Sequence, residues 1–556
     1  MLAKAIIIDG KLVKINCGAE KVNVEASDLN ANNAQVSNFF GAGTSQFSEG
    51  ECIPCKAAAA IGRPVNPILG TKLLPEEVDF AFSGLLPLVW TRSYYSDQLG
   101  VGWLGQGWSV PGCQRVERQS RGFVYIDEQG REILLPELTA GGAGVFIQAE
   151  QMWVTLLANG EIEISGLDRS LTFCFKSLRG DYRHFALVRV YDSHANQQQF
   201  YYDERGLPHK IMDGNGRVFR LVFEAVSENR LRLVSVAWQQ AEDTALTHLL
   251  VRYRYNLEGD LIAVENAQGE KVRQFAYQHH LLTSHQNAAG LVSRYEYDKY
   301  ELGGKVIRNR TNLGEDWQFR YFPNYTEVTD NLGRIEQYHF DHHQALVKRV
   351  FADGSTQQFE RDKLGRLLSQ TDSAGRKTEF RYNAQGQLVE QIRSDNQRQY
   401  YGYDNQGRLI EQIDMMGHTS RYAYDGQGNL IMFTNAEGES QHIVYNEKGL
   451  RTAVIDPLGN RTHFRYNAQH QLVETEDCSG NRTAFRYNEW GQLTGITDAE
   501  GHHTTYRYDE RHQAVQVTYA DGSTAHFHYD FASRLTTYTD SKGNSTHYRY
   551  SLDDFK

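Results

Sequence analysis

The sequence is poor in proline and cysteine and has no long hydrophobic run. It contains 10 prolines in 556 residues, where average usage of about 5% would give roughly 28. Its 6 cysteines are scattered, unlike the dense disulfide framework of a small secreted domain. No stretch of about 18 apolar residues occurs, which excludes a membrane-spanning helix. The apolar start Ala5–Ile8 is too short for a secretory signal peptide, so we expect export without one.

Charge and aromatic content further restrict the class of protein that this sequence can form. The chain has 58 Lys+Arg against 69 Asp+Glu, a formal net charge of −11, which argues against a broad basic surface for nucleic acid. Glycine (49), tyrosine (32) and phenylalanine (26) are abundant. This composition is typical of many strands joined by glycine turns, and no long segment shows a 3.6-residue period. It predicts an acidic, β-rich protein.

The most informative feature is a 21-residue repeat. Nine tyrosines recur at this spacing without an insertion, and Asn or Asp follows the first eight. A second aromatic residue lies two positions before the tyrosine in all copies except one, where Ile443 stands. Glycines and leucines hold further fixed places. The repeat tyrosines are Tyr382, Tyr403, Tyr424, Tyr445, Tyr466, Tyr487, Tyr508, Tyr529 and Tyr550.

Each part of the repeat has a physical meaning. Aromatic-x-aromatic places two rings on one face of a strand, because strand side chains alternate. Asp/Asn-x-x-Gly predicts a turn, since the Asx side chain bonds nearby backbone and glycine accepts positive φ. Two turns per unit predict one β-hairpin per repeat, which buries its ring face only when units stack. The sequence predicts an all-β array of hairpins winding into a large curved sheet or partial hollow shell.

The regularity of the repeat divides the chain. We expect an adaptor-like segment at 1–61, a small β-rich leading domain with a Gly/Trp motif at 62–113, a β-rich region with irregular repeats at 114–330, and the regular array at 331–556. Strands are expected in the leading domain at Val78–Phe82 and Leu88–Tyr95. Looser copies of the repeat precede the array at Tyr191-Asp192, Tyr202-Asp203, Tyr255-Asn256, Tyr297-Asp298 and Phe340-Asp341.

The array is still in register at Tyr550, and no polar capping segment follows before Lys556. We therefore expect the chain to be part of a longer array. A sheet that ends without a cap exposes a strand edge, so self-association of the isolated chain is expected.

These repeats resemble those of Rhs proteins, the bacterial relatives of YD-repeat proteins such as teneurins and insecticidal toxin-complex components. The segments before residue 114 strengthen the resemblance, which covers about residues 62–551. Segments similar to the motifs that open the Rhs core are Gly62-Arg63-Pro64-Val65-Asn66-Pro67, Gly70-Thr71-Lys72, Glu77-Val78-Asp79-Phe80, Leu86–Ser96, Gly102-Trp103 and Gly107-Trp108.

The resemblance implies a sheet wound into a hollow shell around a C-terminal toxin domain, used in interbacterial competition. It also implies partners: the toxin, a type VI secretion apparatus reached through a spike or PAAR-type component at the N-terminus, a chaperone and an immunity protein. Such a protein stays in the bacterial cytoplasm before export. Residues 1–61 do not match a PAAR region, and no toxin domain is present. Asp456-Pro457-Leu458-Gly459 is similar to the family's DPxGL cleavage motif, but Asn460 replaces its leucine and the segment is in phase with ordinary repeat turns.

No segment predicts catalysis, cofactor binding or a metal site. Gly100–Gly105 matches GxGxxG, but the residues up to Pro111 cannot form the required helix, which predicts a Gly/Trp turn. Cys52 and Cys55 form a lone CxxC, with only Cys17 and Cys113 as distant candidates for a zinc set. Histidines gather without a third or fourth convergent ligand at His339, His342 and His343, and at His502 and His503.

Three alternatives to an Rhs shell remain from the sequence. Aromatic-rich repeats also suit a cell-surface or carbohydrate-binding protein. Residues 114–330, where the repeat is weakest, leave room for an enzyme. The abrupt end at Lys556 is equally consistent with a truncated relic of an Rhs gene.

Overall fold

The computed structural model describes residues 60–552, apart from 99, 121, 181, 228–229 and 241–246. These residues form 46 strands and a single 3₁₀ helix, η1 (Gln148–Glu150), which confirms the all-β prediction. No described helix is long and apolar enough to span a membrane. Cys17, Cys52 and Cys55 lie outside the described residues, so the CxxC motif is not described.

The leading domain is built from five short strands. Strand β1 (Leu73–Phe82) pairs with β2 (Leu88–Tyr95), which pairs with β5 (Trp108–Ser109). Strands β3 (Val101–Gly102) and β4 (Gly105–Gln106) form a separate hairpin. Gly102 and Gly105 of the GxGxxG match pair across the tight turn at Trp103 and Leu104, which confirms the predicted Gly/Trp turn, and the two strands expected in this domain both form.

The rest of the chain is dominated by one antiparallel sheet. Strands β9 to β46 each pair with the next in chain order, and β6, which begins the smaller β6-β7-β8 meander, pairs with β13. The strands before the regular repeats are β6 (Arg115–Gln119), β7 (Gly122–Ile126), β8 (Glu132–Leu134), β9 (Val145–Ile147), β10 (Met152–Leu156), β11 (Ile162–Gly166), β12 (Leu171–Ser177), β13 (His184–Asp192), β14 (Gln197–Tyr202), β15 (Pro208–Met212), β16 (Val218–Ser227), β17 (Arg230–Gln239), β18 (Thr247–Tyr255), β19 (Leu261–Asn266), β20 (Lys271–Gln278), β21 (Leu281–Asn287), β22 (Val292–Tyr297), β23 (Val306–Thr311), β24 (Asp316–Tyr321), β25 (Tyr325–Thr329), β26 (Ile335–Phe340), β27 (Leu346–Val350), β28 (Thr356–Arg361) and β29 (Leu367–Thr371).

Two strands per repeat continue the sheet to the end of the described chain. They are β30 (Lys377–Tyr382), β31 (Leu388–Ile392), β32 (Arg398–Tyr403), β33 (Leu409–Ile413), β34 (Thr419–Tyr424), β35 (Leu430–Thr434), β36 (Ser440–Tyr445), β37 (Arg451–Ile455), β38 (Arg461–Tyr466), β39 (Leu472–Glu476), β40 (Arg482–Tyr487), β41 (Leu493–Thr497), β42 (His503–Tyr508), β43 (Ala514–Thr518), β44 (Thr524–Tyr529), β45 (Leu535–Thr539) and β46 (Ser545–His547).

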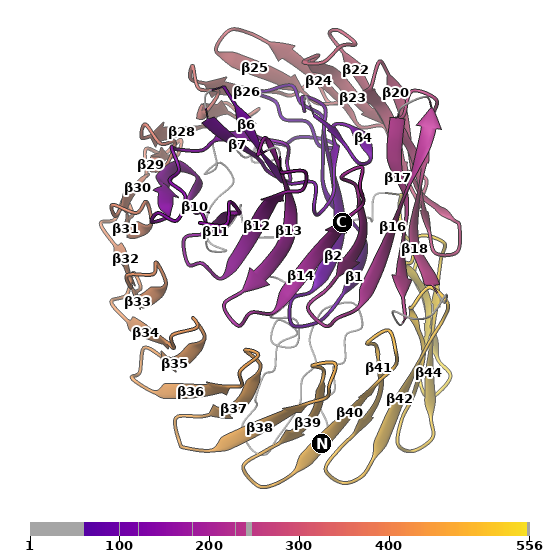
Figure 1. Ribbon diagram of the computed structural model, residues 1–556. Helices are drawn as coiled ribbons and strands as arrows, with labels where there is room; N and C mark the ends of the chain where they lie inside the picture. Colours follow the sequence, from indigo (N-terminus) through magenta and orange to yellow (C-terminus); the bar gives the residue numbers. More distant parts are fainter. Residues whose placement is uncertain are drawn as a thin grey trace.

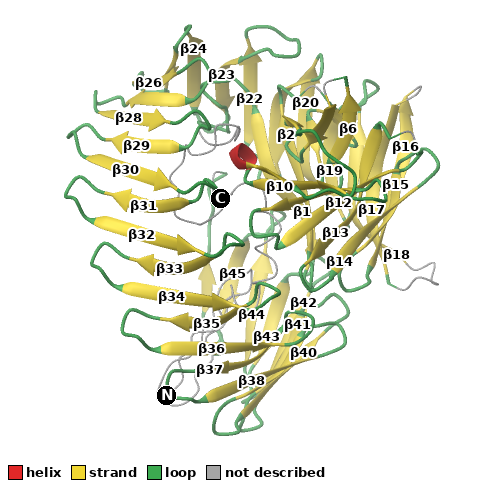
Figure 2. Cartoon of the chain, turned by 60° about the vertical axis from the view of Figure 1, so that its left-hand side comes forward, coloured by secondary structure: helices red, strands yellow, loops and turns green. Residues whose placement is uncertain are grey.

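The sheet coils on itself, so that late strands pass beside early ones (Figure 1). Figure 2 shows β26 to β38 as a ladder along one side of the molecule. We call β9–β23 the first winding and β30–β46 the second winding. Hydrogen bonds between the two windings join residues separated by 234 to 254 positions in the sequence. One full turn of the coil therefore takes about that length of chain.

The leading domain packs against strands of the first winding and buries a charged network there. Arg92 bonds Asp79 at 2.9 Å and Glu77 at 2.6 Å, and its side chain is 3% exposed. The Tyr253 hydroxyl, from β18, donates to Asp79 at 2.6 Å and accepts from Trp90 Nε1 at 2.9 Å. Burial raises the pKa of Asp79, and the charge of Arg92 opposes that shift. The network ties β1 and β2 to the sheet.

The Gly-Thr-Lys segment provides a second attachment. Lys72 is fully buried, and its Nζ donates to the backbone oxygens of Arg63, Pro64 and Leu73. The same Nζ lies 4.6 Å from the ring centre of Tyr295 on β22. Burial lowers the pKa of this amine well below its usual value. Residues at the start of the leading domain are thereby held against the end of the first winding.

We predict that Arg92→Ala strongly destabilises the protein. It leaves the buried carboxylates of Asp79 and Glu77 without this cation, a change that costs about 3–5 kcal/mol. Urea unfolding followed by tryptophan fluorescence measures the loss. The matched control is Arg334→Ala, which removes a guanidinium that is 63% exposed and paired with Asp330, at a cost below about 1 kcal/mol. Equal shifts in the two variants would contradict the prediction.

Candidate functional site: the repeat wall and its seam

The repeat tyrosines bond to backbone as well as burying their rings. Each hydroxyl donates to the carbonyl oxygen of the residue 15 positions earlier, as Tyr487 does to Leu472 at 2.8 Å. The same bond occurs in the irregular region, for example from Tyr297 to Leu282. The other acceptors are Leu367 for Tyr382, Leu388 for Tyr403, Leu409 for Tyr424, Leu430 for Tyr445, Arg451 for Tyr466, Leu493 for Tyr508, Ala514 for Tyr529 and Leu535 for Tyr550.

The position of the acceptor explains why the repeat uses tyrosine. The pairing of β39 with β40 ends at Glu474, so the carbonyl of Leu472 lies beyond the last paired residue. The Tyr487 hydroxyl reaches this carbonyl and extends the bonding between the strands. Burial raises the pKa of Tyr487 to about 12, which keeps the hydroxyl protonated as a donor. A phenylalanine would fill the same space and leave the carbonyl without this donor.

The Asx-x-x-Gly segments form the predicted turns. In one of them Asp404 Oδ1 accepts from the backbone N–H groups of Gln406 and Arg408, both at 2.9 Å. The Arg408 Nε donates to the other carboxylate oxygen at 2.7 Å, and its guanidinium lies 4.8 Å from the ring centre of Tyr424. Gly407 has φ of 79°. One turn therefore links two successive repeats through arginine and tyrosine.

The structure also resolves two ambiguous segments. Asp456–Gly459 forms an ordinary repeat turn, with Gly459 N–H donating to Asp456 O at 3.0 Å, as predicted. The Tyr191-Asp192 pair forms the Asx turn of the repeat, with Asp192 Oδ1 accepting from the N–H groups of His194 and Asn196. Its tyrosine differs from the repeat tyrosines, because it lies at the end of strand β13, which runs opposite to the strands that end in repeat tyrosines. Its hydroxyl bonds Glu163 at 2.7 Å instead of a backbone carbonyl.

The two windings meet along a seam that we define by their facing turns: those after β9, β11, β13, β15, β17, β19 and β21 of the first winding, and those after the repeat tyrosines of the second. Five of its hydrogen bonds run from side-chain amides of the first winding to turn carbonyls of the second: Gln148 to Ala384 (2.7 Å), Gln151 to Gln385 (2.7 Å), Asn196 to Lys448 (3.1 Å), Asn215 to Gln469 (2.8 Å) and Gln268 to Glu510 (2.6 Å). Two more join side chains: Gln240 donates to Glu489 at 2.5 Å, and Asn429 of the second winding donates to His194 at 3.0 Å. An ion pair between Glu270 and Arg511 adds to them.

Trp490 forms an aromatic contact at this largely polar seam. Its ring lies 4.7 Å from that of Trp238 and 5.1 Å from that of His248, both from the first winding, and 6.1 Å from Phe82 of the leading domain. Trp490 occupies a turn position that holds glutamine in several sister repeats, such as Gln427. A tryptophan in a polar turn was therefore a sequence feature that could have revealed the seam.

Glycines of the turns on the opposite rim of the second winding have more room among the described residues. A β-carbon at Gly407 would lie 2.7 Å from Leu167 of the first winding, and one at Gly449 would lie 2.8 Å from His194. A β-carbon at Gly417 or Gly459, on the opposite rim, would meet nothing within 4 Å. Gly407 and Gly449 are thus constrained by close approach to the first winding as well as by positive φ.

The histidine groups of the sequence do not gather into a metal site within the described residues. The group that the structure does bring together is Glu258, Asp260 and His280, whose ligand atoms lie within 4.8 Å of one another. His280 Nδ1 lies 2.6 Å from Asp260 Oδ1. The guanidinium groups of Arg230 and Arg232 bond the adjacent backbone and oppose cation binding there by charge repulsion.

Two family models match the chain. A domain of unknown function (DUF6531) matches residues 62–135. The RHS Repeat matches residues 361–398, 403–440, 445–481, 466–503 and 487–524. The first match covers the leading domain and the meander after it, and the second covers much of the second winding.

Individual relatives agree with these matches. The chain is 32% identical over 355 residues to Toxin protein Tse5 of Pseudomonas aeruginosa, covering 57% of this chain and 26% of that protein. It is 32% identical over 307 residues to Double-stranded DNA deaminase toxin A of Burkholderia cenocepacia, covering 54% and 21%. The chain thus spans about a quarter of the length of these relatives. A structure of the Photorhabdus luminescens Tc holotoxin pore matches with 13% identity and a TM-score of 0.33, covering 82% of this chain and 27% of that one.

We predict that Tyr487→Phe lowers the free energy of unfolding. Losing one hydrogen bond to a half-buried carbonyl costs about 0.5–1.5 kcal/mol. Hydrogen exchange of β39 and β40 measures the local effect. Tyr548→Phe is the control, because that side chain is 41% exposed and precedes the repeat tyrosine by two positions; we expect no change there. Unchanged exchange in the Tyr487 variant would contradict the role given to the hydroxyl.

We predict that Trp490→Ala loosens the seam. Truncation of a packed tryptophan costs about 3–5 kcal/mol, and here the lost contacts lie between windings. Hydrogen exchange should therefore increase around Trp238 in the first winding as well as around residue 490. Gln427→Ala, at the equivalent turn position, should change neither region. An effect confined to the repeat that contains residue 490 would argue against a joined seam.

Proposed function

We propose that this chain, which belongs to the Rhs/YD-repeat family, forms part of the wall of a shell that encloses a toxin. The observation that carries the proposal is the coil of the sheet. The sheet passes beside itself after 234 to 254 residues, and the seam joins the two windings. A coiled sheet with joined windings bounds an interior, and the hydroxyl-to-carbonyl bonds make its wall continuous from repeat to repeat.

The cargo is proposed to be a C-terminal toxin domain, used in interbacterial competition. Two relatives carry the word toxin in their names, and one of those names specifies a deaminase of double-stranded DNA. The chain spans about a quarter of their length, so most of such a protein lies outside the part compared here. We assign enclosure to this chain and the catalytic activity to the cargo.

Delivery is proposed to use a type VI secretion apparatus. A spike or PAAR-type component would bind through residues 1–61, and an immunity protein would protect the producing cell. A chaperone is the remaining expected partner. The protein would stay in the bacterial cytoplasm until export.

Protease protection of the natural gene product that contains this chain tests the proposal. With the wall intact, we expect a fragment from outside residues 1–556 to resist proteinase K. Urea should expose that fragment at concentrations that open the seam but leave the strand signal in circular dichroism. Trp490→Ala should lower the urea concentration needed, and Gln427→Ala should not. Digestion of the fragment at one rate, whether or not the wall is intact, would contradict enclosure.

A further inference from the structure

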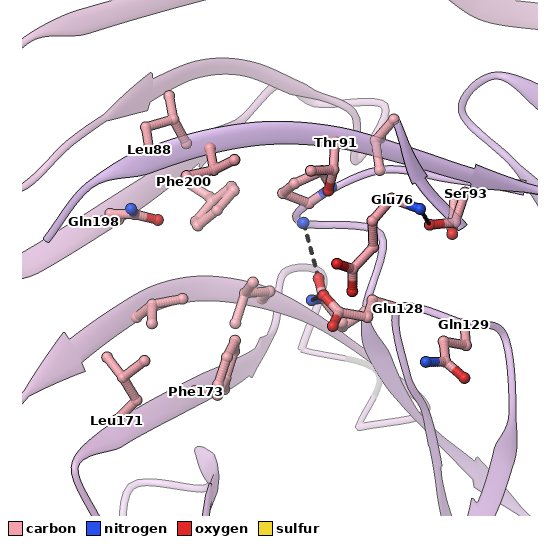
Figure 3. Close-up of a pocket in the computed structure, with 18 of the residues that line it drawn as sticks. Glu76, Leu88, Thr91, Ser93, Glu128, Gln129, Leu171, Phe173, Gln198 and Phe200 are labelled. Atoms are coloured by element: carbon pink, nitrogen blue, oxygen red, sulfur yellow. Dashed lines mark hydrogen bonds between the residues drawn. The ribbon is translucent and has the colours of Figure 1, made fainter. Parts of the chain in front are cut away.

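A small cavity lies where the leading domain meets the first winding. Its volume is about 70 Å³, and strand β2 faces strands β12 to β14 across it (Figure 3). One water requires about 10–15 Å³ on this scale, so the cavity accommodates about five non-hydrogen atoms. Much of the wall is apolar and buried, formed by Leu88, Leu171, Phe173, Leu187, Val190 and Phe200, with the buried Gln198 beside Phe200.

Two carboxylates stand at the mouth of this cavity. Glu76 is exposed and lies in β1 with φ of 41°, and Glu128 is half-buried in the turn after β7. Figure 3 shows their carboxylates facing each other. Gln114, which is 3% exposed, donates from Nε2 to Glu128 at 3.2 Å. The mouth therefore has two acids from separate elements beside an apolar chamber.

The charge of these two acids is not balanced by the described residues around them. No ion pair within 4.0 Å joins Glu76 or Glu128 to a cation in the described part of the chain. The nearby guanidinium of Arg131 bonds Asp127 at 2.7 Å and Glu150 at 3.2 Å instead. Asp127, which precedes Glu128, is buried and adds further negative charge. A cation at the mouth would therefore be attracted by the unbalanced carboxylates.

The pKa shifts of the two acids agree with this geometry. Burial raises the pKa of Glu128 to about 7, the charges of Asp127 and Glu76 raise it further, and Arg131 and Gln114 oppose them. Burial also raises the pKa of Glu76. Both shifts are those of carboxyl groups that lack a compensating cation.

We propose that the cavity binds a short linear alkylammonium ion, with the ammonium group between Glu76 and Glu128 and the aliphatic chain in the apolar chamber. A chain of about four carbons matches the room for five atoms. The polarity of the cavity selects a free amine over a lysine side chain of a partner protein. A lysine would enter ammonium first and place its charge beside Leu171 and Phe173, where desolvation is costly.

Isothermal titration calorimetry of the whole chain with n-butylammonium tests the proposal. We expect saturable binding, and weakening by about tenfold or more in Glu128→Gln, because a charge-assisted bond is lost. Glu76→Gln should also weaken it. Glu132→Gln is the matched control, since Glu132 lies exposed on the neighbouring β8, and it should bind as the unmodified protein does.

Binding of ligand analogues to the unmodified protein tests the proposal without any substitution. n-Butanol has the same size without the charge and should bind more weakly by about tenfold or more. 1,4-Diaminobutane and N-acetyl-lysine methylamide each place an ammonium in the apolar chamber and should bind less well than n-butylammonium. Equal binding of butanol, equal binding of the lysine derivative, or no saturation by n-butylammonium would each overturn the proposal.

The pH dependence gives a final readout. Glu128 must be ionised to attract the ammonium group, and its pKa is about 7. Affinity should therefore rise between pH 6 and pH 8, on either side of about pH 7, while the alkylammonium stays charged. This rise should disappear in Glu128→Gln and persist in Glu132→Gln. An affinity that is flat across this range in the unmodified protein would contradict binding at Glu128.

Discussion

The repeat wall depends on one constraint: at the start of every second strand, a backbone carbonyl has no N–H donor from the next strand. A short hairpin pairs most of its own backbone, but the pairing of β39 with β40 ends at Glu474 and leaves Leu472 outside it. A buried acceptor without a donor is costly, and the Tyr487 hydroxyl supplies the donor. The ring covers apolar surface at the same time. One side chain thus covers the hydrophobic face of the hairpin and completes its hydrogen bonding, which accounts for a tyrosine at every 21st position.

The hairpins of the wall could be predicted because their sequence repeats every 21 residues. The contacts between the windings could not be predicted, because they follow no sequence period. Turn chemistry and alternating rings repeat within 21 residues, so the hairpins and the all-β class followed from the sequence. The hydrogen bond of the tyrosine hydroxyl did not follow from the sequence, because burial alone is enough to explain an aromatic ring at this position. The seam joins residues 234 to 254 positions apart through ordinary amides such as Asn215, which no local pattern distinguishes. Tyr191 shows a related limit: its turn forms as in the repeat, but the direction of its strand decides which rim the turn occupies and which group its hydroxyl meets.

The leading domain shows a different limit of sequence reasoning. Its motif residues were recognisable, yet their roles depend on partners far along the chain. Arg92 lies within the segment Leu86–Ser96, and the hydroxyl beside its carboxylate partner comes from Tyr253. Lys72 contacts Tyr295. A buried charge is tolerated only with its partners in place, so this network also makes docking of the leading domain specific to one place on the sheet. The pair Glu76 and Glu128 lies close to that junction without such a partner.

The chemistry of the seam bears on how arrays of this kind change length during evolution. Most seam acceptors are backbone carbonyls of turns, and every repeat offers such a carbonyl whatever its side chains. Gain or loss of a whole 21-residue unit would slide the second winding by one unit and present an equivalent carbonyl to each donor amide. Gain or loss of half a unit would instead turn the opposite rim toward the first winding, and the strands that end at that rim lack the repeat tyrosine. Duplication in whole units is therefore the tolerated step, whereas side-chain contacts such as those of Trp490 and the Glu270–Arg511 ion pair are tied to single positions.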